Sequence, residues 1–167
     1  MSNVIAIAAS TAFYGNNLAL KNDGTVVEWE VRRNSEEATV KSGLSNVVAI
    51  ATGPNYSLAL KKDGTVFGWG DNGDGQATGI PITDASYNSS GLVTINGQIL
   101  VDVIAIAAGK EFSPALKRDG TVVGWGKNNL HRMDVPAGLN GVVAISAGEN
   151  FCLAITTNNA VADKFRH

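Results

Sequence analysis

The sequence predicts an all-β fold built from repeated blades of short antiparallel strands, and three observations lead to this prediction. A Lys-x-Asp-Gly-Thr-Val core occurs three times between apolar runs. A Val-x-Ala-Ile block precedes each of these copies and then occurs a fourth time. No stretch shows the 3.6-residue apolar period of an amphipathic helix. Self-similarity with a period of about 40 residues is typical of repeat architectures.

The first expected strand of each repeat is a short run of β-branched residues and alanines. Such a run is typical of a strand that is covered on both faces. A glycine follows three of these runs, at Gly53, Gly109 and Gly148. Small alanines and glycines suit a crowded place where neighbouring backbones converge, and in a β-propeller that place is near the central axis.

The second and third expected strands form a hairpin. Gly24, Gly64 and Gly120 each follow an aspartate between two apolar runs, and Asp-Gly in this setting is a strong hairpin signal because glycine accepts a positive φ. A tryptophan ends the third strand in each copy. These residues are expected to fill the wedge between blades, and they are Trp29, Trp69 and Trp125.

A fourth, weaker strand is expected before the next copy, at 38–40 and at 133–135. Four short strands in about 40 residues make a β-propeller blade. The chain is interpreted as a single domain, 1–167, with four repeats. Their bounds are about 3–41, 46–77, 102–136 and 141–163.

An insertion at 78–101 separates the second and third repeats. Asn96-Gly97 lies between alternating apolar residues, which predicts a tight hairpin. The preceding segment, 84–91, is polar and rich in turn-forming residues, and it is expected to be an exposed loop. Loops on a rigid scaffold often carry recognition.

Several blocks of the second repeat resemble the regulator-of-chromosome-condensation repeat. They are Ala49-Ile50-Ala51-x-Gly53, Ser57-Leu58-Ala59-Leu60-Lys61, Asp63-Gly64-Thr65-Val66 and Gly68-Trp69-Gly70-x-Asn72. The resemblance spans Asn3 to about Val161 and is closest in character to bacterial members such as the β-lactamase-inhibitory propeller protein. It implies a propeller, usually with seven blades, that acts through protein–protein contacts.

Two repeats depart from this pattern. Glu28-Trp29-Glu30 replaces Gly-Trp-Gly in the first, and the fourth has no tryptophan and is expected to lack its outer strand. Four blades are fewer than the seven of the family, and an unfinished blade leaves an unpaired sheet edge. The chain is therefore part of a longer protein, or a partial ring completed by oligomerisation, or a small four-bladed ring. Assembly with another chain is favoured.

Composition argues against several classes of function. A net charge of −2 provides no basic field for nucleic acid, and the apolar run at 4–9 is too short to span a membrane. No signal peptide precedes it, so a cytoplasmic location is the default expectation.

Gly68-x-Gly70-x-x-Gly73 matches a dinucleotide motif, but no helix follows. Asp71 and Asp74 miss the calcium-loop spacing, so both segments are interpreted as structural turns.

Catalytic material is scarce as well. The chain has two histidines, His131 and His167, and one cysteine, Cys152. Cys152 occupies the repeat position of Ser57 and Ser113, which predicts a small core residue. The carboxylates show no repeated pairing of the kind that hydrolysis needs. No enzymatic activity, cofactor or metal is expected.

The function predicted from these observations is a non-catalytic protein-binding scaffold that assembles with itself. Aromatic and basic residues that break the repeat in turns are the candidate contacts, because such residues dominate interface energetics. The candidates are Phe13, Tyr14, Arg32, Arg33, Tyr87, His131 and Arg132. Tyr56, Phe112 and Phe151 share one repeat position and are expected in the core. A carbohydrate-binding propeller is the alternative, although its loops would match from copy to copy, and these differ.

Overall fold

All regular structure in the described residues is β-strand. The computed structural model describes residues 2–10, 12, 15–30, 38–84, 87–129, 131, 133–157 and 161–162. Within this part of the chain there is no helix long and apolar enough to cross a lipid bilayer. The strands form antiparallel sheets in chain order, which confirms the all-β prediction.

Blades 1 and 2 each contain four strands. Blade 1 consists of β1 (Val4–Ala8), β2 (Asn16–Lys21), β3 (Val26–Glu30) and β4 (Thr39–Val40). Blade 2 consists of β5 (Val47–Thr52), β6 (Tyr56–Lys61), β7 (Val66–Asp71) and β8 (Asn88–Leu92). In both blades each strand pairs with the one before it in sequence.

Blades 3 and 4 each contain three strands within the described residues. Blade 3 consists of β11 (Val103–Ile106), β12 (Phe112–Lys117) and β13 (Val122–Gly126). Blade 4 consists of β14 (Val142–Ala147), β15 (Cys152–Thr156) and β16 (Val161–Ala162). A hairpin of β9 (Thr94–Ile95) and β10 (Gln98–Ile99) lies between blades 2 and 3 in sequence.

The insertion differs in part from its predicted structure. The hairpin at Asn96-Gly97 is confirmed, and both turn residues have positive φ, 51° and 78°. The expected exposed loop at 84–91 is wrong over its second half, because Asn88–Leu92 pairs with β7 as the outer strand of blade 2. The sequence of β8 is polar and gave no strand signal, and its pairing with the neighbouring strand decides its conformation.

The strand expected at 133–135 is also wrong. The side chain of Asn128 makes hydrogen bonds to this segment. Its Oδ1 accepts from the amide of Met133, and its Nδ2 donates to Asp134. The amide of Asp134 donates to the carbonyl of His131, which closes a turn. Met133 instead lies against Gly124 of β13, where a Cβ would meet its sulfur at 2.8 Å.

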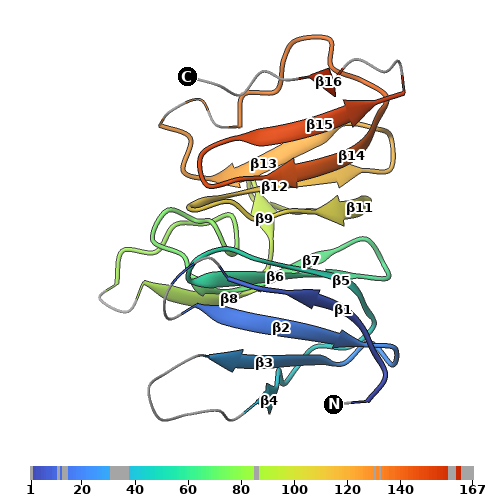
Figure 1. The fold of residues 1–167 in the computed structure, drawn as a ribbon. Helices are drawn as coiled ribbons and strands as arrows, with labels where there is room; N and C mark the ends of the chain where they lie inside the picture. The colour runs from blue at the N-terminus through green and yellow to red at the C-terminus, as the bar shows by residue number, and fades with distance from the viewer. Residues whose placement is uncertain are drawn as a thin grey trace.

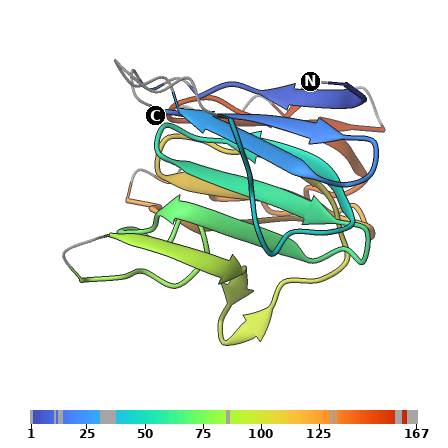
Figure 2. The ribbon, with the colours of Figure 1, turned by 90° about the horizontal axis from the view of Figure 1, so that it is seen from below.

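The blades stack face to face, and the stack is open. Figure 1 shows blade 1 and blade 4 at opposite ends, with blades 2 and 3 between them. Figure 2, turned by 90°, shows strands of successive blades running across one another in layers. Closure as a four-bladed ring, one of the three alternatives, is therefore not observed in this chain.

The hydrophobic core lies at the junctions between blades. At the first junction Leu18 and Leu20 of blade 1 pack in one cluster with Val47 and Trp69 of blade 2. At the second junction Leu58 and Leu60 share a cluster with Trp125 of blade 3. Each sheet therefore buries its faces against the neighbouring blades. Trp29 has no preceding blade in this chain, and it is half-buried where Trp69 and Trp125 are buried.

The start of each blade has a fixed backbone geometry. Asn3, Asn46, Asp102 and Gly141 each precede the first strand and have φ of 63°, 56°, 61° and 62°. Asn, Asp and Gly are the residues that tolerate this left-handed region. Their carbonyls accept from amides just after the second strand, such as that of Lys62 for Asn46. The repeat thus specifies how the chain enters every blade.

Tyr56 links blade 2 to blade 3. Its buried hydroxyl donates to the carbonyl of Phe112 at 2.6 Å, and it lies 3.1 Å from the carbonyl of Gly109 and 3.0 Å from the hydroxyl of Ser113. Burial raises the pKa of Tyr56 above its usual value, so the phenol remains a hydrogen-bond donor.

We predict that Tyr56→Phe lowers the free energy of unfolding by about 1–3 kcal/mol, because it removes a buried donor that two carbonyls of the next blade face. Tyr87→Phe is the matched control, since its side chain is exposed, and it is expected to change stability by less than about 0.5 kcal/mol. Urea denaturation followed by tryptophan fluorescence measures both. Equal effects of the two variants would show that the link does not stabilise the junction.

Candidate functional site

The candidate site is one end of the blades, called here the loop end. It is formed where the first and third strands of each blade end and the second strand begins. In blade 2 the amide of Asp71 donates to the carbonyl of Asn55, and in blade 3 the amide of Lys127 donates to that of Glu111 in the same way. The connections that leave β7 and β13 therefore start at equivalent places.

An open depression of about 580 Å³ lies at the loop end of blade 2. Its lining combines carboxylates, amides and one aromatic ring. The lining residues are Asn55, Asp71, Gly73, Asp74, Tyr87 and Asn88. The ring of Tyr87 lies against Gly73, where a Cβ would meet the ring at 3.2 Å. A ligand on this surface would meet hydrogen-bond donors and acceptors beside an exposed aromatic ring.

The loop that forms this depression is held by Asn72. The side chain of Asn72 is buried, and its Oδ1 accepts from the amides of Ala77 and Thr78 at 2.9 Å. Its Nδ2 donates to Thr78 Oγ1 at 2.8 Å and to the carbonyl of Ile80 at 2.7 Å. The backbone amide of Asn72 donates to the carbonyl of Tyr87, so the same residue fixes both ends of the loop.

Gln76 anchors the loop between blades 2 and 3. Its carbonyl accepts from Nε1 of Trp125 at 2.9 Å and from the hydroxyl of Ser113 at 2.8 Å. Its side-chain Oε1 accepts from the amide of Asp74 at 3.0 Å. Hydrogen bonds therefore join the loop that lines the depression to blade 3.

Blade 1 uses a different residue to accept the hydrogen bond from the tryptophan indole of the next blade. A Cβ on Gly68 would meet the carbonyl oxygen of Ala77 at 1.9 Å, so the returning loop of blade 2 requires glycine. Blade 1 has Glu28 at this repeat position. Its carboxylate accepts from Nε1 of Trp69 at 2.7 Å and from Nδ2 of Asn16 at 2.8 Å. The departure at Glu28 therefore supplies the acceptor that Gln76 provides in the next junction.

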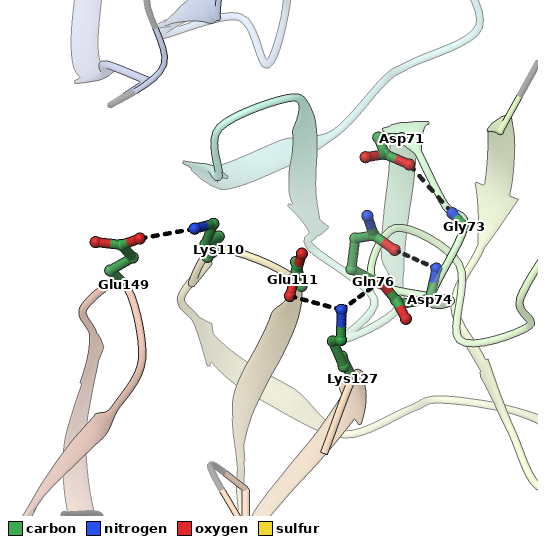
Figure 3. A network of polar contacts seen from close by, with 8 residues as sticks. All are labelled: Asp71, Gly73, Asp74, Gln76, Lys110, Glu111, Lys127 and Glu149. Atoms are coloured by element: carbon green, nitrogen blue, oxygen red, sulfur yellow. Dashed lines mark hydrogen bonds and ion pairs between the residues drawn. The ribbon is translucent and has the colours of Figure 1, made fainter. Parts of the chain in front are cut away.

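Ion pairs continue across the loop end (Figure 3). Lys127 of blade 3 lies 3.1 Å from Glu111 of the same blade and 3.6 Å from Asp74 of blade 2. The hydrogen bond with Glu111 and the charge of Asp74 raise the pKa of Lys127. Lys110 pairs with Glu149 of blade 4 at 2.9 Å. Because these side chains are exposed or only partly buried, each pair is expected to add little stability.

Two of the seven residues predicted as contacts lie in the described part of the chain. Tyr87 lines the depression, is exposed and has a φ of 50°. His131 is exposed in the connection after β13, has a φ of 56°, and contacts Asp134 through Nδ1 at 2.6 Å. Hydrogen bonds from Asn128 and then His131 lower the pKa of Asp134. The remaining five, Phe13, Tyr14, Arg32, Arg33 and Arg132, lie outside the described residues.

The structure adds residues that the sequence reasoning missed. Asn72 belonged to the repeat motif but was not recognised as the residue that holds the loop, and Gln76 carried no signal. The repeated Gly-Trp-Gly-x-Asn pattern was the available clue, because Asn128 in blade 3 also accepts from the amide five residues later. A side chain that caps a loop in two copies predicts a fixed loop.

Among the described residues, no cysteine or histidine lines the depression. Cys152 is buried, and burial raises the pKa of its thiol to about 12, so it remains protonated. Among the described residues no three His, Cys, Asp or Glu side chains are grouped so as to hold a metal ion. The lining of the depression offers hydrogen-bonding groups and one aromatic ring.

We predict that Asn72→Ala lowers the free energy of unfolding by about 1–3 kcal/mol and opens the 73–84 loop to proteases, because two buried amides lose their acceptor. Asn128→Ala is the matched control at the same repeat position, where the side chain is exposed and water replaces the lost partner. Urea denaturation and timed proteolysis with fragment mass analysis measure the two effects. A loop as resistant in Asn72→Ala as in the parent chain would contradict this account.

Comparison with known proteins identifies the repeat. Residues 47–76 and 103–132 match the family described as "Regulator of chromosome condensation (RCC1) repeat". The E3 ubiquitin-protein ligase HERC2 of Mus musculus is 32% identical in an alignment of 127 residues that covers 68% of this chain and 2% of that protein. Protein pim1 of Schizosaccharomyces pombe is 30% identical in an alignment of 122 residues that covers 68% of this chain and 22% of pim1.

A solved structure shares the fold. The crystal structure of Prp20p from Saccharomyces cerevisiae superposes with a TM-score of 0.72 at 21% identity, and the match covers 95% of this chain and 44% of that one. The chain thus spans only a small part of the curated relatives it matches and less than half of this propeller. Together these matches show that the chain contains regulator of chromosome condensation (RCC1) repeats at 47–76 and 103–132, and that its sheets fold as consecutive β-propeller blades.

Proposed function

We propose that this chain is a non-catalytic scaffold that binds a protein through its loop end. The observation that carries the proposal is the depression beside Tyr87, whose loop is fixed by Asn72 and anchored between blades by Gln76. A rigid surface loses little conformational entropy on binding. An exposed tyrosine beside polar groups is also a composition that is enriched at interface hot spots.

The binding described for a protein of the same fold supports the same class of function. Prp20p, which shares the fold, is described with its binding properties to Gsp1p and histones. A propeller of this type can therefore present surfaces that bind proteins. The loops of this chain are its own, so its partner is to be identified by experiment and is not transferred from Prp20p.

A carbohydrate-binding role is the second candidate, and one observation favours it. The depression places the carboxylates of Asp71 and Asp74 and the amide of Asn55 near the ring of Tyr87, which are groups that sugars use for hydrogen bonding and stacking. The equivalent connection of blade 3 begins with Lys127-Asn128 and contains His131, so the site is not repeated. This lack of repetition favours a protein partner.

The proposal is tested by placing a photo-crosslinking phenylalanine at position 87 and, as a control, at position 62, which is exposed in the hairpin turn at the opposite end of blade 2. We expect position 87 to form adducts with a defined protein and position 62 to form none. With that protein purified, Tyr87→Ala should weaken binding tenfold or more, about 1.4 kcal/mol. Identical adducts at both positions would contradict a loop-end site, and binding only to a glycan array, lost in Tyr87→Ala, would establish the sugar alternative.

A further inference from the structure

The outward face of blade 4 exposes residues that are buried in every other blade. The second strands of blades 2 and 3 are buried at all of their first five positions, whereas β15 alternates between buried and exposed residues. Leu153 is 37% exposed, and its equivalent in blade 2, Leu58, is fully buried. Ile155 is 52% exposed, and its equivalent Leu60 is buried.

Phe151 behaves in the same way. It shares a repeat position with Tyr56 and Phe112, which are both buried, and it was expected in the core. That expectation is wrong, because Phe151 is 44% exposed. Its ring lies over Gly148, as Tyr56 lies over Gly53, so its local setting is the same. What differs is the neighbouring blade, because blade 3 bonds to Tyr56, whereas among the described residues no further sheet follows blade 4.

The internal junctions show what covers such a face. At the first junction Ile50 of blade 2 packs in one cluster with Leu18 and Leu20 of blade 1 and with its small residues Ala6 and Ala8. At the second junction Ile106 of blade 3 joins Leu58 and Leu60 of blade 2 and its Ala49 and Ala51 in the same arrangement. An isoleucine from the next blade therefore packs against a groove of two large and two small residues.

Blade 4 has this groove without its isoleucine. The equivalent residues, Leu153, Ile155, Ala144 and Ser146, line a cavity of about 240 Å³ together with Ile145 and Ala154, which also belong to the cluster shared with blade 3. The walls are apolar apart from Ser146, so a charged or strongly polar segment would leave its groups without partners there.

Blade 1 has the isoleucine without its groove. Ile7 pairs with Ala19 in the register in which Ile50 pairs with Ala59 and Ile106 pairs with Ala115. Ile7 is 76% exposed, whereas its equivalents Ile50, Ile106 and Ile145 are all half-buried in junctions. Val4 and Trp29 on the same face are also more exposed than their equivalents in blades 2 and 3. The two ends of the stack are thus the two halves of one junction.

We propose that a second copy of this chain covers the outward face of blade 4 with its own blade 1, and that Ile7 of this copy enters the groove beside Leu153 and Ile155. The contact is head-to-tail, because a different surface of each copy takes part. It rests on the proposed function as a scaffold and specifies one of its partners. The chemistry is that of the internal junctions, so no new type of contact is required.

The test is the solution mass of the full chain, measured by size exclusion with light scattering over a range of concentrations. The parent chain is expected to show masses above that of one chain that rise with concentration. Ile7→Asp and Leu153→Asp should each reduce the mass to that of one chain, because each places a charge in the apolar junction. Ile5→Asp is the matched control, since the equivalents of Ile5 are exposed in every blade.

Mixing the two variants tests the head-to-tail geometry. Ile7→Asp retains an intact groove and Leu153→Asp retains an intact Ile7, so a mixture can form one correct junction and should recover a species of two chains. Recovery also shows that both variants are folded. A parent chain with the mass of one chain at all concentrations, association unaffected by either variant, or failure of the mixture to associate would each overturn the proposal. Crosslinking at position 87 in Ile7→Asp reports on the loop end separately.

Discussion

Burial between neighbouring blades is the interaction on which the rest of the structure depends. Each blade is a sheet of short strands with two apolar faces, and neither face is covered by its own blade. The clusters around Trp69 and Trp125 are made from residues of two blades each. The same requirement explains the features that recur in the repeat. The turns, the left-handed residues before each first strand and the returning loops each help to place one sheet against the next.

The loop end is a consequence of this stacking. The loop held by Asn72 reaches into the junction through Gln76, so a feature that fixes two blades also fixes the surface beside Tyr87. Glu28 shows how a departure from the repeat is accommodated, since its carboxylate accepts from the indole of Trp69 at the first junction, as the carbonyl of Gln76 accepts from that of Trp125 at the second. The residues that join the two blades therefore also position the depression that we propose for recognition.

Most of the strands could be predicted from the sequence because their signals are local. The Asp-Gly turns, Asn96-Gly97 and the Val-x-Ala-Ile blocks each specify a conformation within a few residues. The strand at Asn88–Leu92 could not, because its pairing with β7 overrides a polar sequence. The exposure of Phe151 could not either, because it depends on whether another blade lies against it. The role of Gln76 could not be predicted for the same reason, since its carbonyl bonds to Ser113 and Trp125 of the next blade.

The central claim is that the leucines of each second strand, such as Leu58, are buried by the neighbouring blade and not by their own sheet. The most direct test compares the loss of stability in Leu58→Ala with that in Leu153→Ala, which are equivalent positions of blades 2 and 4, at a concentration where the chain is dispersed. Leu58→Ala should cost about 2–5 kcal/mol, as expected for a buried leucine, and Leu153→Ala clearly less. Equal losses at the two positions would mean that each blade buries its own leucine, and would contradict the account.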